Sequence, residues 1–140
     1  MTVEHIMSRE VVTVAPDKAL MEIREQFHLG GFHHLLVVDD DELVGVISDR
    51  DVLQALSPFL NTLSEEHRDV RTLSRSAREI MRADPITVRA DTSITEAAAT
   101  LLDNAISCLP VLSESGALEG IVTSKDILQH FIDVDRNGDG

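Results

Sequence analysis

Two short stretches of the chain carry the same side chains at the same spacing, and their residue types suit the binding of a sugar and an anion. These stretches are Gly45-x-x-Ser48-x-x-Asp51 and Gly120-x-x-Thr123-x-x-Asp126. An ionised carboxylate only accepts hydrogen bonds, so each aspartate can take two of them from a vicinal diol. A Ser or Thr that begins a helix leaves free backbone N–H groups, which favour an anion such as phosphate. Arg50 and Lys125 lie inside the motifs and add positive charge.

The same spacing also fits an ordinary helix start. In a capping box, a Ser or Thr accepts a hydrogen bond from the third residue of the helix, and an acidic side chain there accepts one from the cap. A single copy of the motif would favour this structural interpretation. Two copies, each directly after an apolar strand that begins with glycine, favour ligand binding, although the cap stays open as an alternative.

Other reactive side chains predict no catalysis and no metal site. His33 and His34 are adjacent on a predicted strand and point to opposite faces, so they cannot easily share one ion. The run 39–41 of aspartates suits a turn. Cys108 lies in an apolar strand, where a free cysteine behaves as a small hydrophobe. No spacing indicates a catalytic triad, and we expect no enzyme activity.

The two motifs belong to a repeat that runs through most of the chain. Ile6-Met7 returns as Ile80-Met81, and Thr13-Val14 returns as Thr87-Val88, both at an offset of 74 residues. One extra residue near Gly116 changes the offset to 75, which aligns residues 45–54 with 120–129. The matches are collinear, so the chain consists of two copies of one unit.

Each copy is predicted to run strand, helix, strand, strand, helix. In the first copy these elements are the strand 11–14, a helix capped by Asp17 and ended by Gly30-Gly31, the strands 35–38 and 43–47, and a helix from Ser48. In the second copy they are 86–88, 93–102, 109–112, 118–122 and 123–132. This order predicts an α/β (α+β) fold with a three-stranded mixed sheet in each copy and helices on one face. The two βαββα copies should pack about a pseudo-twofold axis. The predicted boundaries are 1–56 for copy one, 57–76 for a connector, 77–132 for copy two and 133–140 for a tail.

The connector and the tail are both polar. The four arginines of the connecting region are spaced 3, 4 and 3 residues apart, which would place them on one face of a helix: Arg68, Arg71, Arg75 and Arg78. We expect a solvated face, with a docking stripe for an acidic partner as the alternative. The tail, residues 133–140, matches the first half of a calcium-binding EF-hand loop but ends before the closing glutamate. We expect a disordered acidic terminus there, with calcium binding as the minor alternative.

Composition excludes several classes of function. The sequence has 12 Lys and Arg against 25 Asp and Glu, a formal net charge of -13, which argues against nucleic-acid and anionic-membrane partners. No apolar run approaches the ~20 residues of a membrane span, and no signal peptide is apparent. Cys108 is the single cysteine, so no internal disulfide can form, and we expect a cytoplasmic protein.

The doubled pattern resembles a tandem pair of CBS domains, also called a Bateman module. The resemblance covers residues 3–56 and 77–132 and rests on both motifs, on the repeated Ile-Met and Thr-Val pairs, and on the segment 106–111. It implies a non-enzymatic regulatory module with two clefts between the repeats, one or both of which bind AMP, ADP, ATP or S-adenosylmethionine as regulatory ligands. It also implies a homodimer that acts on an unknown regulated protein. The alternative is a protein–protein scaffold whose clefts are unoccupied.

The resemblance assigns roles to individual residues. Asp51 and Asp126 would bind ribose hydroxyls, with Ser48 and Thr123 helping to hold ribose or phosphate. The remaining residues would come from the opposite repeat and enclose the adenine: Ile86, Ile106 and Ser107 for the Asp51 cleft, and Val12, Phe32 and His33 for the Asp126 cleft. Two positions depart from an even repeat, since Leu36 stands opposite Pro110 and Phe32-His33 is bulkier than Ile106-Ser107.

Overall fold

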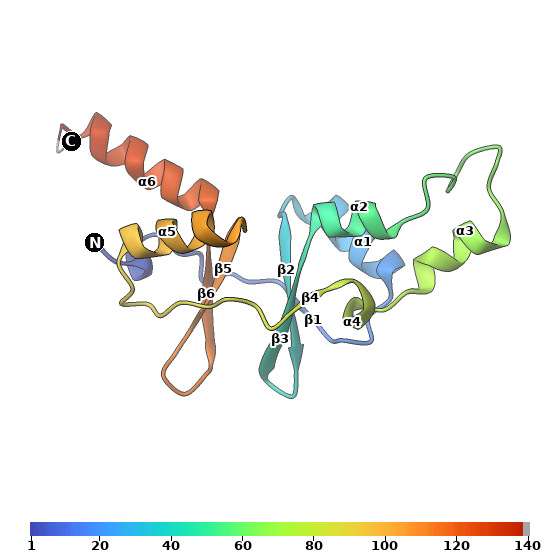
Figure 1. Ribbon diagram of the computed structural model, residues 1–140, viewed down its shortest axis with the longest axis horizontal. Helices are drawn as coiled ribbons and strands as arrows, with labels where there is room; N and C mark the ends of the chain where they lie inside the picture. The colour runs from blue at the N-terminus through green and yellow to red at the C-terminus, as the bar shows by residue number, and fades with distance from the viewer. Residues whose placement is uncertain (139–140) are drawn as a thin grey trace. The chain divides into compact units, whose positions relative to one another are not determined.

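The computed structural model describes residues 1–138, which fold as two compact units (Figure 1). We call Val12–Asp84 the Asp51 unit, and Met1–Val11 together with Pro85–Gly140 the Asp126 unit. The units therefore do not coincide with the sequence repeats, because the first residues of the chain pack with the second repeat. Each unit is described by itself below.

The Asp51 unit is built on a four-stranded sheet in the order β1-β2-β3-β4. Its elements are β1 (Thr13–Val14), α1 (Leu20–Gly30), β2 (His34–Asp39), β3 (Glu42–Ser48), α2 (Asp49–Ala55), α3 (His67–Arg71), η2 (Thr72–Ser74), α4 (Ala77–Ile80) and β4 (Arg82–Ala83). Strand β1 is parallel to β2, whereas β2–β3 and β3–β4 are antiparallel. The prediction of three strands was wrong, because β4 comes from the start of the second repeat and adds a fourth strand to this sheet.

The Asp126 unit repeats this plan with fewer regular strands. Its elements are η1 (Val3–His5), α5 (Ile94–Asn104), β5 (Cys108–Leu112), β6 (Leu118–Thr123) and α6 (Ser124–Arg136). Strands β5 and β6 form an antiparallel pair. A parallel bridge from Val88 to Val111 flanks it on one side, and an antiparallel bridge from Ser8 to Ile121 flanks it on the other. The predicted strand 86–88 is thus reduced to one bridged residue.

Each unit is completed by the segment at the start of the other sequence repeat. We call residues 1–11 lead segment 1 and residues 75–84 lead segment 2. In the Asp126 unit, Val3 N–H donates to the carbonyl oxygen of Thr92 at 2.8 Å. The equivalent bond in the Asp51 unit runs from Ala77 N–H to the carbonyl oxygen of Lys18, also at 2.8 Å. These matching bonds show that both lead segments dock in the same way.

The apolar cores confirm this exchange. In the Asp51 unit, Ala77 of lead segment 2 is fully buried with residues of the first repeat such as Leu35 and Ile47. In the Asp126 unit, Val3 of lead segment 1 is fully buried beside Leu109. Because burial of apolar surface is the main stabilising contribution to folding, each lead segment is part of its unit's core.

The motif glycines allow the lead segments to cross the hairpins. A Cβ at Gly45 would lie 2.4 Å from the Sδ atom of Met81, and a Cβ at Gly120 would lie 2.5 Å from the backbone oxygen of Ser8. Both separations are far below van der Waals contact, so a larger residue would require the Met81 side chain or the Ser8 backbone to move. The first residue of each motif therefore positions a lead segment beside the motif aspartate.

Three local predictions were wrong. Asp17 does not cap α1, which begins after Ala19, because the backbone on either side of Ala19 is hydrogen-bonded to lead segment 2. The four arginines do not share one helix face, because the chain leaves the helical conformation at Arg75, whose ψ is 147°. The terminus is not disordered over residues 133–136, which continue α6. Asp139 and Gly140 lie outside the described residues.

Three predictions from local sequence signals are confirmed: the end of one helix, the cap of another and the turn of a hairpin. Gly31 ends α1 in the left-handed conformation, with φ of 69°. Ser93 caps α5 by accepting a hydrogen bond from Glu96 N–H at 3.0 Å. The acidic turn between β2 and β3 has two residues at positive φ, Asp40 and Asp41, as a tight hairpin turn requires.

Candidate functional site

The first motif lies where β3 ends and α2 begins, and its two polar side chains form a complete capping box. Asp51 N–H donates to Ser48 Oγ at 3.1 Å, and Ser48 N–H donates to Asp51 Oδ2 at 2.9 Å. Asp51 is buried, with 9% of its surface exposed. The capping interpretation is therefore confirmed as geometry, and it uses only one of the two carboxylate oxygens.

The other oxygen of Asp51 faces a residue that sequence reasoning missed. Arg82 of β4 places Nε 3.6 Å from Asp51 Oδ1. This pairing depends on lead segment 2 crossing β3, where Arg82 is opposite Val46 in the antiparallel register. No local sequence signal marks Arg82, because it lies outside the motif and its repeat counterpart is Ser8.

The second motif has the same geometry at the start of α6. Asp126 N–H donates to Thr123 Oγ1 at 3.2 Å, and Thr123 N–H donates to Asp126 Oδ2 at 2.9 Å. Here the remaining oxygen, Asp126 Oδ1, forms no hydrogen bond or ion pair with any of the residues 1–138. The two motifs thus form capping boxes of the same geometry, and they differ in the residue that faces the second carboxylate oxygen.

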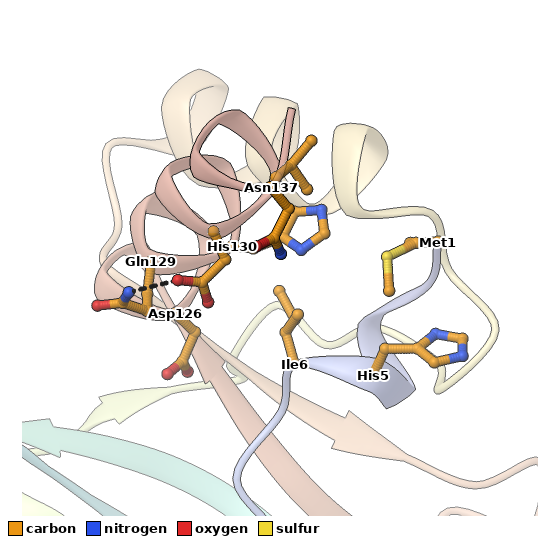
Figure 2. Close-up of a pocket in the computed structure, with 9 residues that line it drawn as sticks. Met1, His5, Ile6, Asp126, Gln129, His130 and Asn137 are labelled. Atoms are coloured by element: carbon orange, nitrogen blue, oxygen red, sulfur yellow. Dashed lines mark hydrogen bonds between the residues drawn. The ribbon is translucent and has the colours of Figure 1, made fainter. Parts of the chain in front are cut away.

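Asp126 also lines a hollow of about 500 Å³ between lead segment 1 and α6 (Figure 2). Its other lining residues come from these two elements: Met1, His5, Ile6, Gln129, His130, Asp133, Val134 and Asn137. Gln129 Nε2 donates to Asp133 Oδ1 at 2.9 Å across one helical turn. Within the described part of the chain, the lining carries two carboxylates, two imidazoles and two amides, and no Lys or Arg.

In each unit, the residue just before the first strand of the hairpin lies beside the helix that carries the motif aspartate. These residues are His33, before β2, and Ser107, before β5. Asp49 N–H donates to the carbonyl oxygen of His33 at 3.0 Å, and Ser124 N–H donates to that of Ser107 at 2.9 Å. His33 also places Nδ1 2.9 Å from Asp49 Oδ2. This side-chain hydrogen bond holds the pKa of the exposed Asp49 carboxyl below its usual value. His33 and Ser107 therefore lie beside the motif of their own unit.

Next to this pair, burial lowers the pKa of His34 below its usual value, against the opposing charges of Asp49 and Asp51. A half-buried imidazole of this kind favours its neutral form.

The other predicted residues lie as follows. Val12 and Phe32 are half-buried against the core of the Asp51 unit, and the Phe32 ring packs 5.3 Å from that of Phe27. Ile106 is half-buried against the Asp126 core, while Ile86 is exposed. Arg50 and Lys125 are exposed on the first turns of α2 and α6. Each predicted cleft draws residues from both units, so the two clefts stay predictions.

Two classes of feature are absent from the described residues. Within residues 1–138, no group of three or more His, Cys, Asp or Glu side chains is arranged to hold a metal ion. Over the same range, no helix combines the length and the apolar composition that a membrane crossing requires.

The family model described as "CBS domain" matches the chain twice, over residues 3–58 and 77–133. A CBS domain-containing protein of Dictyostelium discoideum is 34% identical over 134 residues, covering 94% of this chain and 92% of that protein. Protein MJ1225 of Methanocaldococcus jannaschii is 28% identical over 130 residues, and this chain spans only 46% of its length. The inosine-5'-monophosphate dehydrogenase of Korarchaeum cryptofilum is 34% identical, with 89% of this chain matched to 23% of the enzyme.

Solved structures agree with this assignment. CBSX2 of Arabidopsis thaliana, solved in complex with AMP, superposes with a TM-score of 0.78 at 28% identity, covering 96% of this chain and 98% of that one. The CBS domain pair of protein MJ0100, solved with 5-methylthioadenosine and S-adenosyl-L-methionine, gives a TM-score of 0.77 at 26% identity, covering 94% and 95%. Both repeats of the sequence thus match one family, and the chain belongs to the CBS-domain family as a tandem CBS pair.

Proposed function

We propose that this CBS pair is a regulatory module that binds adenosine-type ligands at two sites, one containing Asp51 and the other containing Asp126. The observation that carries the proposal is that the two oxygens of each motif carboxylate have different roles. In both units Oδ2 accepts the bond from the helix cap, which fixes the side chain, while Oδ1 takes no part in the cap. A carboxylate oriented in this way is an acceptor for a ribose hydroxyl.

Two similar structures support the ligand class. CBSX2 was solved with AMP, and the MJ0100 pair was solved with 5-methylthioadenosine and S-adenosyl-L-methionine. All three compounds contain an adenine base on a ribose that keeps its 2'- and 3'-hydroxyls, with phosphate or sulfur at the 5' position. By extension, AMP, ADP, ATP and S-adenosylmethionine are the ligands that we propose for this chain.

The module would act without catalysis. Ligand binding changes an equilibrium between two conformations only if the ligand binds one of them more tightly. We propose that occupancy alters the relative arrangement of the two repeats, or of two copies in a homodimer, and so changes the activity of a regulated protein.

A thermal-shift and titration panel tests this proposal. The intact chain is heated with AMP, ADP, ATP, 5-methylthioadenosine or S-adenosylmethionine, with GMP as the matched control. A ligand present at 100 times its Kd raises the free energy of unfolding by about 2.7 kcal/mol, which gives a clear rise in melting temperature. No rise with any adenosine compound, or an equal rise with GMP, would contradict adenosine binding and favour the scaffold alternative.

A further inference from the structure

The two motif aspartates differ in one neighbouring residue, which is a positively charged arginine for Asp51 and an uncharged serine for Asp126. Arg82 lies 3.6 Å from Asp51 through its Nε atom, and 61% of its side chain is exposed. Among the described residues, Arg82 forms no other ion pair or side-chain hydrogen bond. A guanidinium presents five N–H donors in a planar fork, so the contact with Asp51 leaves its terminal amino groups available.

The corresponding position beside Asp126 is occupied by a serine. Arg82 is opposite Val46 in β3, and Ser8 is opposite Ile121 in β6, so the two residues hold equivalent places in their units. Ser8 Oγ donates to the carbonyl oxygen of Glu10 at 3.3 Å. The hollow beside Asp126 is lined by two carboxylates, two imidazoles, two amides and three apolar side chains and, within residues 1–138, by no Lys or Arg side chain.

We infer that Arg82 gives the Asp51 site a preference for phosphorylated adenosine ligands, and that the Asp126 site, with Ser8, lacks this preference. The inference rests on the proposed function, in which Asp51 binds the ribose hydroxyls. A 5'-phosphate is attached to the same ribose ring as that diol, so a guanidinium beside the carboxylate is within reach of it. Arginine binds phosphate oxygens through paired N–H groups.

The acidity of the chain makes this local charge important. At a formal net charge of -13, the protein repels an anionic ligand, and cations close to the site offset that repulsion. Arg50 and Lys125 place one cation in each motif, so Arg82 is the additional cation that distinguishes the Asp51 site. An uncharged adenosine compound meets no such repulsion. The presence or absence of the arginine should therefore change the ratio of the AMP and adenosine affinities rather than both affinities together.

Isothermal titration of AMP and of adenosine into Arg82→Ser and Ser8→Arg tests the inference. Arg82→Ser should weaken AMP binding by about 5- to 20-fold, the lower part of the range for hydrogen bonds to charged groups because the side chain is partly exposed. Adenosine affinity should change by less than about 2-fold. Ser8→Arg should strengthen AMP binding at the second site. Arg78→Ser is the matched control, because it removes a charge from the same lead segment at a residue that pairs with Asp39.

Each other outcome overturns the inference in a recognisable way. If Arg82→Ser weakens AMP and adenosine equally, Arg82 only positions Asp51 and does not select phosphate. If Arg78→Ser lowers AMP affinity as much as Arg82→Ser, the effect is one of net charge. If the unmodified chain binds neither AMP nor adenosine, the proposed function itself fails, and the inference fails with it.

Discussion

Replacing the motif glycines by alanine should destabilise the two units unequally. At Gly45 the added Cβ meets only the side chain of Met81, at 2.4 Å from Sδ and 2.8 Å from Cγ. At Gly120 it meets the backbone oxygen of Ser8 at 2.5 Å, and that residue is held in a bridge to Ile121. A methionine can change rotamer, whereas a bridged backbone cannot move without breaking its hydrogen bonds.

The magnitudes follow from these contacts. Overpacking costs about 1–3 kcal/mol, and alanine regains about 0.5–1 kcal/mol over glycine within a strand. Gly45→Ala should therefore lose about 1 kcal/mol or less of unfolding free energy, and Gly120→Ala about 2 kcal/mol or more, measured by urea denaturation. Adding Met81→Ala should relieve most of the cost of Gly45→Ala, since it leaves only the Met81 Cβ, 3.0 Å from the new Cβ. Met7→Ala should not relieve Gly120→Ala. Equal losses in the two alanine variants, or a larger loss at Gly45, would refute this account of the crossing.

Three further predictions concern the caps, the pH dependence and the assembly. Ser48→Ala and Thr123→Ala should each lower the unfolding free energy by about 0.5–2 kcal/mol in denaturant titrations, and no loss would mean that the caps are not maintained in solution. Because burial lowers the pKa of His34, the unfolded chain binds more protons, so stability should fall as the pH drops below the ordinary value of 6.5. His34→Gln should flatten the dependence of unfolding free energy on pH between pH 7 and 5.5, whereas His28→Gln, at an exposed histidine, should not. Equal slopes in the two variants would exclude His34 as the cause. Light scattering should report the mass of a dimer. Phe131→Asp, at a side chain that is 72% exposed on α6, should shift that mass toward the 15.4 kDa monomer. A monomer mass for the unmodified chain would exclude the dimer.

Local signals predicted the elements that local bonds determine. The hairpins follow alternating apolar residues interrupted by turn residues, and Ser48, Thr123 and Ser93 each cap the helix that follows them. These features involve partners within a few residues, so the sequence carries their pattern directly.

Features that depend on distant partners could not be predicted in this way. Nothing near Asp17 reveals that lead segment 2 holds the following residues in an extended bridge and delays α1 until Leu20. Arg82 reaches Asp51 for the same reason, since both belong to one unit only after the lead segment has crossed β3. The internal repeat located the motifs, but the exchange of lead segments between repeats is a tertiary arrangement.

The length of α6 was missed for a different reason. Its last turn contains Asp133 and Asp135, whose spacing resembles a calcium loop and whose charge disfavours a helix C-terminus. The bond from Gln129 to Asp133 and the backbone bond from Asn137 to Asp133 nevertheless extend the helix through Arg136.

The most direct test of ligand binding by the motif aspartates compares Asp51→Asn and Asp126→Asn with Asp69→Asn. Asp69 is a matched control, because it is buried and accepts a hydrogen bond from the N-cap Glu66 of α3 at 2.7 Å, outside both motifs. Melting temperature and AMP affinity are measured on the same samples. We predict that all three variants melt at lower temperature, and that only the two motif variants lose AMP affinity, by about 5- to 150-fold at the affected site. Unchanged AMP affinity in both motif variants, with lowered melting temperatures, would contradict the ribose assignment and leave Asp51 and Asp126 as helix caps alone.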